Sequence, residues 1–334
     1  MKKKKVLITI AIVLFAVTLA GFIAFSGFVG YMTFTNSTKL STNENTDMEH
    51  SIAYFESVGF DYSAFLNEYN ISSIKIPSSF EEHTIPADYI VSESEDADTV
   101  IMIHGLGGNR QTVFPNAGLF LQQGYNVLAY DQRSAGENTA QYSTFGYLES
   151  NDTADCVAYL DKLLSSDKQI YIWGVSNGAG TAGLSVRHDI VESRVEGLIL
   201  DCPISNTRDM IRVAMEDMNL GVSLDFPLFC GNIWNRAVLG FTYDQASTAE
   251  SLAESNLMVL MLATEADKVT PYWMAEEIHR AAPNTTLVSV KDSPHAEIYF
   301  EYPELYKESV LSFLEFGKSL PRFRIEVPES EGVQ

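Results

Sequence analysis

Gly174-Val175-Ser176-Asn177-Gly178 determines the architecture that this chain can adopt. The mostly apolar run Gln169–Trp173 before it predicts a buried strand, and the small residues 179–185 after it predict a tightly packed helix. A Gly-x-Ser-x-Gly turn between strand and helix is sharp enough to raise the serine hydroxyl above the sheet, within reach of a substrate carbonyl. Because an ordinary Gly/Ser loop can carry the same five letters, the rest of the chain must supply the partners of Ser176.

Two later loops carry those partners. A serine hydroxyl is a poor nucleophile at neutral pH, so a histidine must take its proton and a carboxylate must hold that histidine in one tautomer. The strand-like run Leu257–Leu262 leads into a turn with Asp267, and the run Thr286–Val290 leads into a loop with His295. We therefore predict Ser176 as nucleophile, His295 as base and Asp267 as orienting acid.

Other acids and bases remain alternatives. Glu265 lies two residues before Asp267, and Asp201 ends the strand-like run Gly197–Leu200, while Asp292 is too close to His295 along the chain to be preferred. The other five histidines lie in polar segments, in a glycine-rich loop or on helix-like stretches where solvent exposure is expected, and they are His50, His83, His104, His188 and His279.

Five motifs together carry a family resemblance. They are the loop His104–Arg110 after the strand-like run Thr99–Ile103, the segment Tyr130–Gly136, the serine turn, the turn Asp267–Pro271 and Ser293-Pro294-His295. With them, residues from about 70 to 318 resemble the α/β-hydrolase superfamily, and within it the bacterial serine hydrolases with a single N-terminal membrane segment. The resemblance implies the chain order serine, acid, histidine. It also implies an α/β fold in which a mostly parallel central sheet is flanked by helices, with a helical lid after the sixth strand.

The resemblance also implies an oxyanion hole and no cofactor or metal. The two backbone N–H groups of the hole would belong to Leu106, in the glycine-rich loop, and to Asn177, after the nucleophile. Many relatives carry Met, Gln or Leu at the position of Asn177. Only its N–H is needed, so this difference affects the acyl pocket rather than catalysis. Asp131 and Arg133 are expected to form a structural ion pair or brace.

A nucleotide-binding glycine loop is the main rival interpretation of the glycines. Gly178-Ala179-Gly180-Thr181-Ala182-Gly183 fits G-x-G-x-x-G, and Asp201 follows where a ribose-binding acid could lie. The predicted strand ends at Trp173, however, so the pattern begins too late for a tight strand-to-helix turn. We therefore favour the serine turn.

Composition and charge restrict the partners. The 334-residue chain has a formal net charge of −22, of which four N-terminal lysines contribute +4, so the remainder carries −26. An acidic surface argues against nucleic-acid binding and against adhesion to anionic lipid headgroups. Three isolated cysteines, Cys156, Cys202 and Cys230, suggest neither a metal site nor a redox pair, and buried packing is expected for Cys156 and Cys202.

The N-terminus predicts a membrane anchor. Lys2-Lys3-Lys4-Lys5 precedes 29 uncharged residues, Val6 to Phe34, which as a helix would span about 43 Å, more than the roughly 30 Å of a hydrocarbon core. The lysines place this end in the cytoplasm and the rest of the chain outside the cell. A signal peptide cleaved near Ala20 is the alternative, but the residues that follow are still mostly apolar.

The domain organisation follows from these segments. We expect the lysines and anchor over 1–35, a flexible linker over 36–51, the hydrolase domain over 52–320 with a lid at about 204–256, and an acidic tail over 321–334. Within the domain, 52–69 predicts a short helix and 73–91 two antiparallel strands. The lid segment is apolar and rich in methionine, which suits either packing on the sheet or a pliable cover over an acyl pocket.

Three functions remain open at this point. The favoured one is a membrane-tethered serine hydrolase that cleaves a carboxylic ester through an acyl-enzyme on the outer face of the membrane. A peptidase or amidase acting on small peptides would use the same three residues. A non-catalytic binding protein that has kept the fold is the third, and its catalytic residues would be expected to decay.

Overall fold

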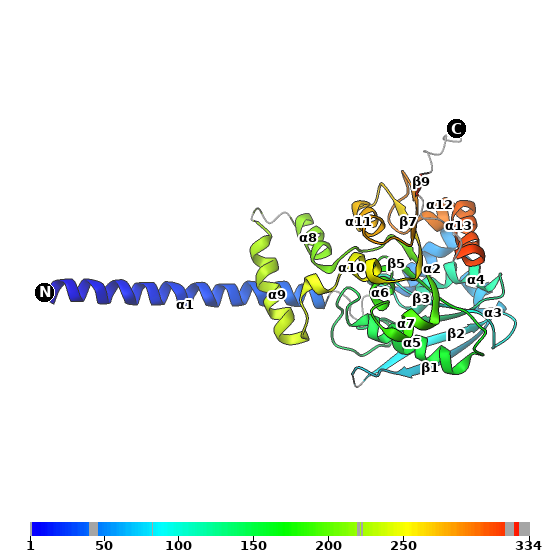
Figure 1. The fold of residues 1–334 in the computed structure, drawn as a ribbon, viewed down its shortest axis with the longest axis horizontal. Helices are drawn as coiled ribbons and strands as arrows, with labels where there is room; N and C mark the ends of the chain where they lie inside the picture. The colour runs from blue at the N-terminus through cyan, green and yellow to red at the C-terminus, as the bar shows by residue number, and fades with distance from the viewer. Residues whose placement is uncertain are drawn as a thin grey trace.

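A nine-stranded sheet lies at the centre of the computed structural model, which describes residues 2–39, 46–81, 83–218, 221, 223–317 and 324–326 (Figure 1). The strand order is β1-β2-β4-β3-β5-β6-β7-β8-β9. The strands are β1 Asn70–Pro77, β2 Thr84–Val91, β3 Thr99–Ile103, β4 Asn126–Tyr130, β5 Ile170–Val175, β6 Val195–Asp201, β7 Met258–Thr264, β8 Thr285–Val290 and β9 Arg324–Glu326.

The sheet is antiparallel at one edge and parallel elsewhere. Strand β2 pairs antiparallel with both β1 and β4, and every other neighbouring pair is parallel. The predicted antiparallel start over 73–91 is thereby confirmed. The parallel strands lie with their carboxyl ends at one edge, where ligand sites of open α/β sheets form.

Both faces of the sheet are buried, which explains why its central strands are uninterrupted apolar runs. In β3, Val100 and Met102 point into one hydrophobic cluster and Ile101 and Ile103 into the other, and all four are fully buried. Helices α2, α3, α4, α12 and α13 contribute to the face of Val100 and Met102, and α5, α6, α7, α10 and α11 to the face of Ile101 and Ile103.

The helices of the domain are short, and most connect consecutive strands. Their bounds are α2 Met48–Ser57, α3 Tyr62–Glu68, α4 Phe114–Leu121, α5 Glu149–Leu163, α6 Asn177–Ser185, α7 Asp189–Arg194, α8 Thr207–Asp217, α9 Asp225–Leu239, α10 Thr248–Glu254, α11 Trp273–Ala281, α12 Ile298–Glu301 and α13 Pro303–Phe316, with 3-10 turns η1 Arg110–Val113 and η2 Tyr243–Gln245.

Three boundaries differ from the sequence-based expectation. The single helix predicted over 52–69 is two helices, because Gly59 adopts a left-handed φ of 91° and the Asp61 side chain caps a new helix by accepting the N–H of Ala64. The expected linker 36–51 contributes its ends to α1 and α2, and its residues 40–45 lie outside the described residues. Residues 324–326 of the expected tail form β9, which pairs with β8.

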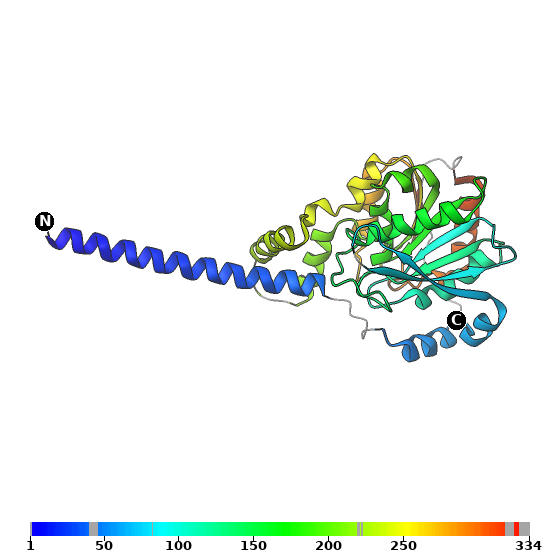
Figure 2. The same ribbon diagram turned by 90° about the horizontal axis from the view of Figure 1, so that it is seen from below.

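Helix α1, Lys2–Thr38, extends from the domain as a single long rod (Figures 1 and 2). It has 37 residues, and an 18-residue window within it has a mean hydropathy of 2.8. Its last turns contact the segment between β6 and β7, where α9 crosses it (Figure 1). The predicted lid segment 204–256 therefore includes helices that pack against α1.

Candidate active site

The turn between β5 and α6 holds Ser176 in a strained backbone conformation. Its φ is 56° and its ψ is −118°, values that a non-glycine residue adopts only when its surroundings impose them. The two flanking glycines are sterically required. A Cβ on Gly174 would lie 2.3 Å from the carbonyl oxygen of Gly178, and one on Gly178 would lie 2.1 Å from that of Ile103. The turn therefore has the geometry of a nucleophile elbow.

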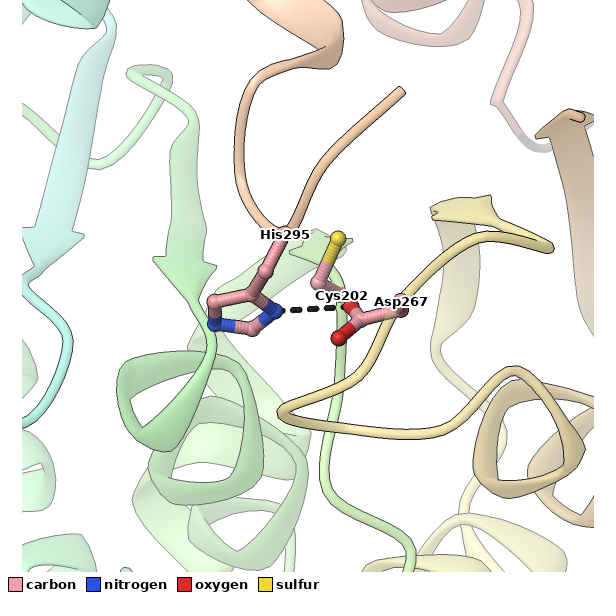
Figure 3. A group of neighbouring side chains, drawn as sticks. All are labelled: Cys202, Asp267 and His295. Atoms are coloured by element: carbon pink, nitrogen blue, oxygen red, sulfur yellow. Dashed lines mark hydrogen bonds and ion pairs between the residues drawn. The ribbon is translucent and has the colours of Figure 1, made fainter. Parts of the chain in front are cut away.

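Ser176, His295 and Asp267 come together above the carboxyl ends of β5, β7 and β8. The Nε2 atom of His295 lies 2.9 Å from Ser176 Oγ, and its Nδ1 atom lies 2.7 Å from Asp267 Oδ2. An ionised carboxylate only accepts hydrogen bonds, so Nδ1 carries the proton and Nε2 is free to accept one from the serine. Figure 3 shows the bond between His295 and Asp267.

Asp267 is held by its own turn as well as by His295. Its Oδ1 accepts the backbone N–H groups of Val269 and Thr270, each at 2.8 Å. Burial is the largest influence and favours the neutral acid, but the hydrogen bonds and charge of His295 and these two N–H groups outweigh it and lower the pKa of Asp267. The carboxylate is thus ionised at neutral pH, as an acid that orients a histidine must be.

The alternative acids are exposed to solvent or bonded to groups other than His295. Glu265 is exposed, and Asp292 is exposed and accepts a hydrogen bond from Tyr302. Asp201 is buried, and its Oδ2 accepts the hydroxyl hydrogen of Tyr306 at 2.9 Å. Burial raises the pKa of Asp201 to about 6, against the hydrogen bond from Tyr306.

Three of the other histidines make side-chain contacts. Their polar or charged neighbours in the sequence had suggested exposure to solvent instead. His83 Nε2 lies 3.0 Å from Asp152 Oδ2, His188 lies 3.2 Å from Ser150 Oγ, and His279 lies 2.8 Å from Thr285 Oγ1. The expectation of solvated side chains was wrong for His188 and His279, because helix–helix and helix–strand packing covers them. His50 is exposed.

The loop after β3 is fastened against the elbow. The loop lies directly beside Ser176, since a Cβ on Gly105 would be in ordinary van der Waals contact with the Cβ of Ser176, at 3.5 Å. His104 shapes this loop: its Nε2 accepts the N–H of Gln132 at 3.0 Å, which leaves Nδ1–H to donate to the carbonyl of Gly105 at 2.7 Å. Asn177 is buried at the start of α6, and Leu106 is partly exposed in the loop.

Gln132 is a positioning residue that sequence reasoning did not single out. Its Nε2 donates to the carbonyl of His104 at 2.6 Å, and its Oε1 accepts the hydroxyl of Thr181 on α6 at 2.7 Å. It therefore links the glycine-rich loop to the helix that follows the nucleophile. The motif Tyr130–Gly136 contains Gln132, but its two partners are 28 and 49 residues away in sequence.

The predicted pairing of Asp131 with Arg133 is wrong. Asp131 instead accepts the backbone N–H and the Nη1 of Arg110, at 2.8 and 2.5 Å. Arg133 pairs with Glu81 at 2.5 Å and lies 3.9 Å from Asp152. Asp131 and Arg133 lie in the turn after β4 with Gln132 between them, and each pairs with a side chain more than 20 residues away in sequence. Both pairs brace the loop near the site.

Cys202 lies beside the acid and the base (Figure 3). The Sγ atom and the ligand atoms of Asp267 and His295 all lie within 4.8 Å of one another. These are the residues of the described chain that could hold a soft cation, but Asp267 and His295 already bond each other. Burial raises the pKa of the Cys202 thiol well above its usual value, which favours the protonated, packing form. All three cysteines are free and buried, as predicted for Cys156 and Cys202.

The sheet order, the elbow and a comparison with protein families define the class. Residues 98–229 match the family described as alpha/beta hydrolase fold, and residues 231–322 match the family described as TAP-like protein. The chain is therefore an α/β hydrolase with a long apolar N-terminal helix. This confirms the resemblance inferred from the sequence.

Among curated proteins, the chain is similar to YqkD of Bacillus subtilis, at 24% identity over 68% of this chain and 74% of YqkD. It is also similar to lysophosphatidylserine lipase ABHD12 of Bos taurus, at 28% identity over 59% of this chain. That match covers 50% of the lipase, so the chain spans about half the length of this relative.

Solved structures share the fold. An esterase of Pyrococcus furiosus superposes with a TM-score of 0.60 at 19% identity, over 77% of this chain and 96% of the esterase. An esterase of Exiguobacterium antarcticum gives a TM-score of 0.54 at 19% identity, over 73% of this chain and 100% of that esterase. At this identity the likeness establishes the fold alone.

Proposed function

We propose that the protein is a serine hydrolase that cleaves carboxylic esters through an acyl-enzyme. The observation that carries the proposal is the unbroken hydrogen-bonded series from Asp267 through His295 to Ser176, which ends on a strained elbow. A scaffold protein would have no physical need to keep the strain, the two close-approach glycines and the ordered histidine together.

In the proposed reaction, Ser176 Oγ attacks the ester carbonyl while His295 Nε2 takes its proton. The imidazolium that forms is stabilised by ionised Asp267, and it then gives the proton to the leaving alkoxide oxygen. An acyl group is left on Ser176. A water molecule, activated in turn by His295, attacks this acyl group and releases the acid, which restores the free serine.

The oxyanion of each tetrahedral intermediate is proposed to be held by the backbone N–H groups of Leu106 and Asn177. Support comes from the position of the loop beside Ser176, and from the position of Asn177 as the first residue of α6, where backbone N–H groups are free of helical partners. The two hydrogen bonds of Gln132 hold the loop and the helix in fixed positions relative to each other.

The proposed substrate is an ester that resides at a membrane, and the catalytic domain is proposed to lie on its outer face. The apolar helix α1 and the four lysines before it support tethering with the N-terminus in the cytoplasm. Similarity to a lysophosphatidylserine lipase supports esters over amides. The segment 204–256 is proposed to act as a lid, since its helix α9 packs against α1.

A substrate panel tests the reaction type. The full-length protein is assayed with p-nitrophenyl esters of graded chain length beside aminoacyl p-nitroanilides, and kcat/KM is measured for each. We expect ester hydrolysis and at least a hundred-fold lower kcat/KM on the anilides. Preferential cleavage of the anilides would favour a peptidase, and turnover of neither class would favour a binding protein.

A further inference from the structure

Helix α9 packs against the C-terminal half of α1, in part through aromatic side chains. The ring of Phe226 lies 6.0 Å from that of Phe22 and 6.2 Å from that of Phe25, between ring centroids. Trp234 donates its indole N–H to the carbonyl of Gly27 at 2.9 Å and packs edge-on against Tyr31. The contact therefore runs along about three turns of each helix.

Small residues let the two backbones approach closely. A Cβ on Gly30 would lie 2.6 Å from the carbonyl oxygen of Cys230, and one on Gly231 would lie 2.6 Å from the Cγ2 of Thr33. Close approach through small residues is typical of helices that pack within or beside a bilayer. Helices α1 and α9 therefore pack as one unit. Their contact surface, called the seam below, would be exposed if α9 left α1.

The length of α1 places that unit at the edge of a bilayer. Twenty residues from Val6 to Phe25 span about 30 Å, the thickness of a hydrocarbon core. The contacts with α9 begin at Phe22, in the last turn of this span, and continue through the apolar remainder to Thr33. On α9 itself, Phe229 and Ile233 remain 63% and 55% exposed, one helical turn apart. Large apolar side chains exposed beside a membrane span fit insertion of α9 into the interfacial layer.

A cavity of about 260 Å³ lies between α1, α8 and α9. Most of its wall is apolar, from Phe28 and Met32 on α1 to Met215 on α8 and Pro227 on α9. Its α1 wall begins at Phe28, within a turn of the expected end of the hydrocarbon core. Methionine side chains line it from two helices, and they adapt to flexible apolar ligands.

The same cavity adjoins the helix of the nucleophile. Its wall includes Phe145, whose carbonyl oxygen would lie 3.9 Å from a Cβ on Gly180. Gly180 is in the first turn of α6 and donates its N–H to the carbonyl of Ser176 at 3.1 Å. A chain held between Phe28 and Phe145 would thus lie between the membrane span and the side of the domain that carries α6.

We propose that the cavity between α1, α8 and α9 binds the alkyl chain of a single-chain ester drawn from the bilayer. Helix α9, inserted in the interfacial layer, forms the entrance. The occupant is a bilayer lipid rather than a protein helix, because the cavity is narrow, apolar and continuous with the membrane span. This inference rests on the proposed ester hydrolysis and names the substrate class that the site selects.

Two measurements on the full-length protein in phosphatidylcholine vesicles test it. The first is photo-crosslinking with the methyl ester of a 12-carbon acid that carries a diazirine near the end of the chain far from the ester. It is done on a Ser176→Ala background so that nothing is hydrolysed. The second is the ratio of kcat/KM for p-nitrophenyl dodecanoate to that for p-nitrophenyl acetate. Ala214→Trp fills the cavity, and Ala281→Trp, at an exposed position of α11, is the matched control.

We expect cross-links within 28–37 and 211–218, and a fall of at least ten-fold in the dodecanoate-to-acetate ratio for Ala214→Trp only. Cross-links at other segments, or equal ratios in the two variants, would overturn the cavity assignment even if esters are hydrolysed. Should Ala214→Trp not fold, the cross-link map of the unfilled cavity decides the matter alone. Cross-links in the cavity of the Ser176→Ala protein, together with hydrolysis of neither ester by the wild-type protein, would overturn the proposed function and leave the binding site standing.

Discussion

Asp267 and Asp201 are two buried carboxyl groups near one histidine. Their different hydrogen-bond partners shift their pKa values in opposite directions. Asp267 receives two backbone N–H groups and the imidazole, which lower its pKa despite burial. Asp201 accepts the hydroxyl hydrogen of Tyr306, its Oδ1 accepts no hydrogen bond from the residues that the structure describes, and burial raises the pKa of Asp201. Hydrogen bonding to the charged form, rather than distance from the strand end, therefore distinguishes the proposed orienting acid from its neighbour.

Asp267→Asn should lower kcat for ester hydrolysis by roughly 10³–10⁴-fold, because an amide no longer holds His295 in the tautomer that accepts the serine proton. Glu265→Gln, two residues away and exposed, is the matched control and should stay within two-fold of wild type. Both variants are compared by kcat and by thermal unfolding. A near-wild-type rate for Asp267→Asn, with a loss in Glu265→Gln or Asp201→Asn, would reassign the acid.

Asp201 should make stability depend on pH. Because its pKa rises from an ordinary 3.8 to about 6 on folding, the folded state binds its proton more tightly, and this stabilisation is present below pH 3.8 and lost as pH rises to 6. A shift of this size corresponds to about 3 kcal/mol. Asp201→Asn binds no proton, so its free energy of unfolding relative to wild type should increase between pH 4 and 7. A difference that stays constant over this range would contradict the assignment.

At the scale of elements, the elbow depends on how closely α6 approaches β3 and β5. A methyl group at position 178 would overlap the carbonyl oxygen of Ile103, and the backbone around Ser176 would have to move. At positions 174 and 178 the backbones of β3, β5 and α6 come so close that no side chain fits, and the strained turn depends on this close approach. Stability and catalysis share the same contacts here.

Gly178→Ala should destabilise the protein by about 1–3 kcal/mol through overpacking and should also reduce ester hydrolysis. Gly118→Ala is the matched control, since Gly118 lies in α4 and a methyl group there would meet no atom within 4 Å beyond its own helix backbone. At that position, alanine should be neutral or stabilising because of its higher helix propensity. Thermal unfolding of the two variants decides, and equal melting temperatures would show that the elbow is not tightly packed.

The strands and the candidate triad could be predicted because they depend on local pattern. The run Thr99–Ile103 is apolar throughout and coincides with β3, and loops directly after strands placed Asp267 and His295. Contacts between distant segments could not be predicted. The partner of Asp131 is a side chain from another loop, and the seam between α1 and α9 joins segments about 200 residues apart. Neither leaves a periodic signal in the sequence.

At the scale of the molecule, an acidic domain is attached to an apolar helix that begins with four lysines. The two parts are not independent, because Ser37 Oγ lies 3.1 Å from Tyr243 Oη and the last turns of α1 are buried. The helix thus fixes the orientation of the domain rather than serving only as a flexible tether. Such a connection would keep the same face of the domain toward the bilayer.

Protease added to intact cells should degrade the domain and leave a small membrane-bound fragment that contains α1, because the lysines are expected to stay in the cytoplasm. The fragment is detected with a tag at the N-terminus, and lysed cells are the control. Complete protection of the full-length protein until lysis would contradict an outward-facing domain.

Covalent labelling of Ser176 tests the central claim most directly. Full-length protein is treated with a fluorophosphonate probe, and Ser176→Ala is compared with Ser193→Ala, an exposed serine on α7. Stability should change by about 1 kcal/mol or less in both variants, since no core volume is lost. We expect labelling and ester hydrolysis to vanish together in folded Ser176→Ala and to persist in Ser193→Ala. A folded Ser176→Ala protein that is still labelled and still hydrolyses esters at the wild-type rate would show that another residue is the nucleophile.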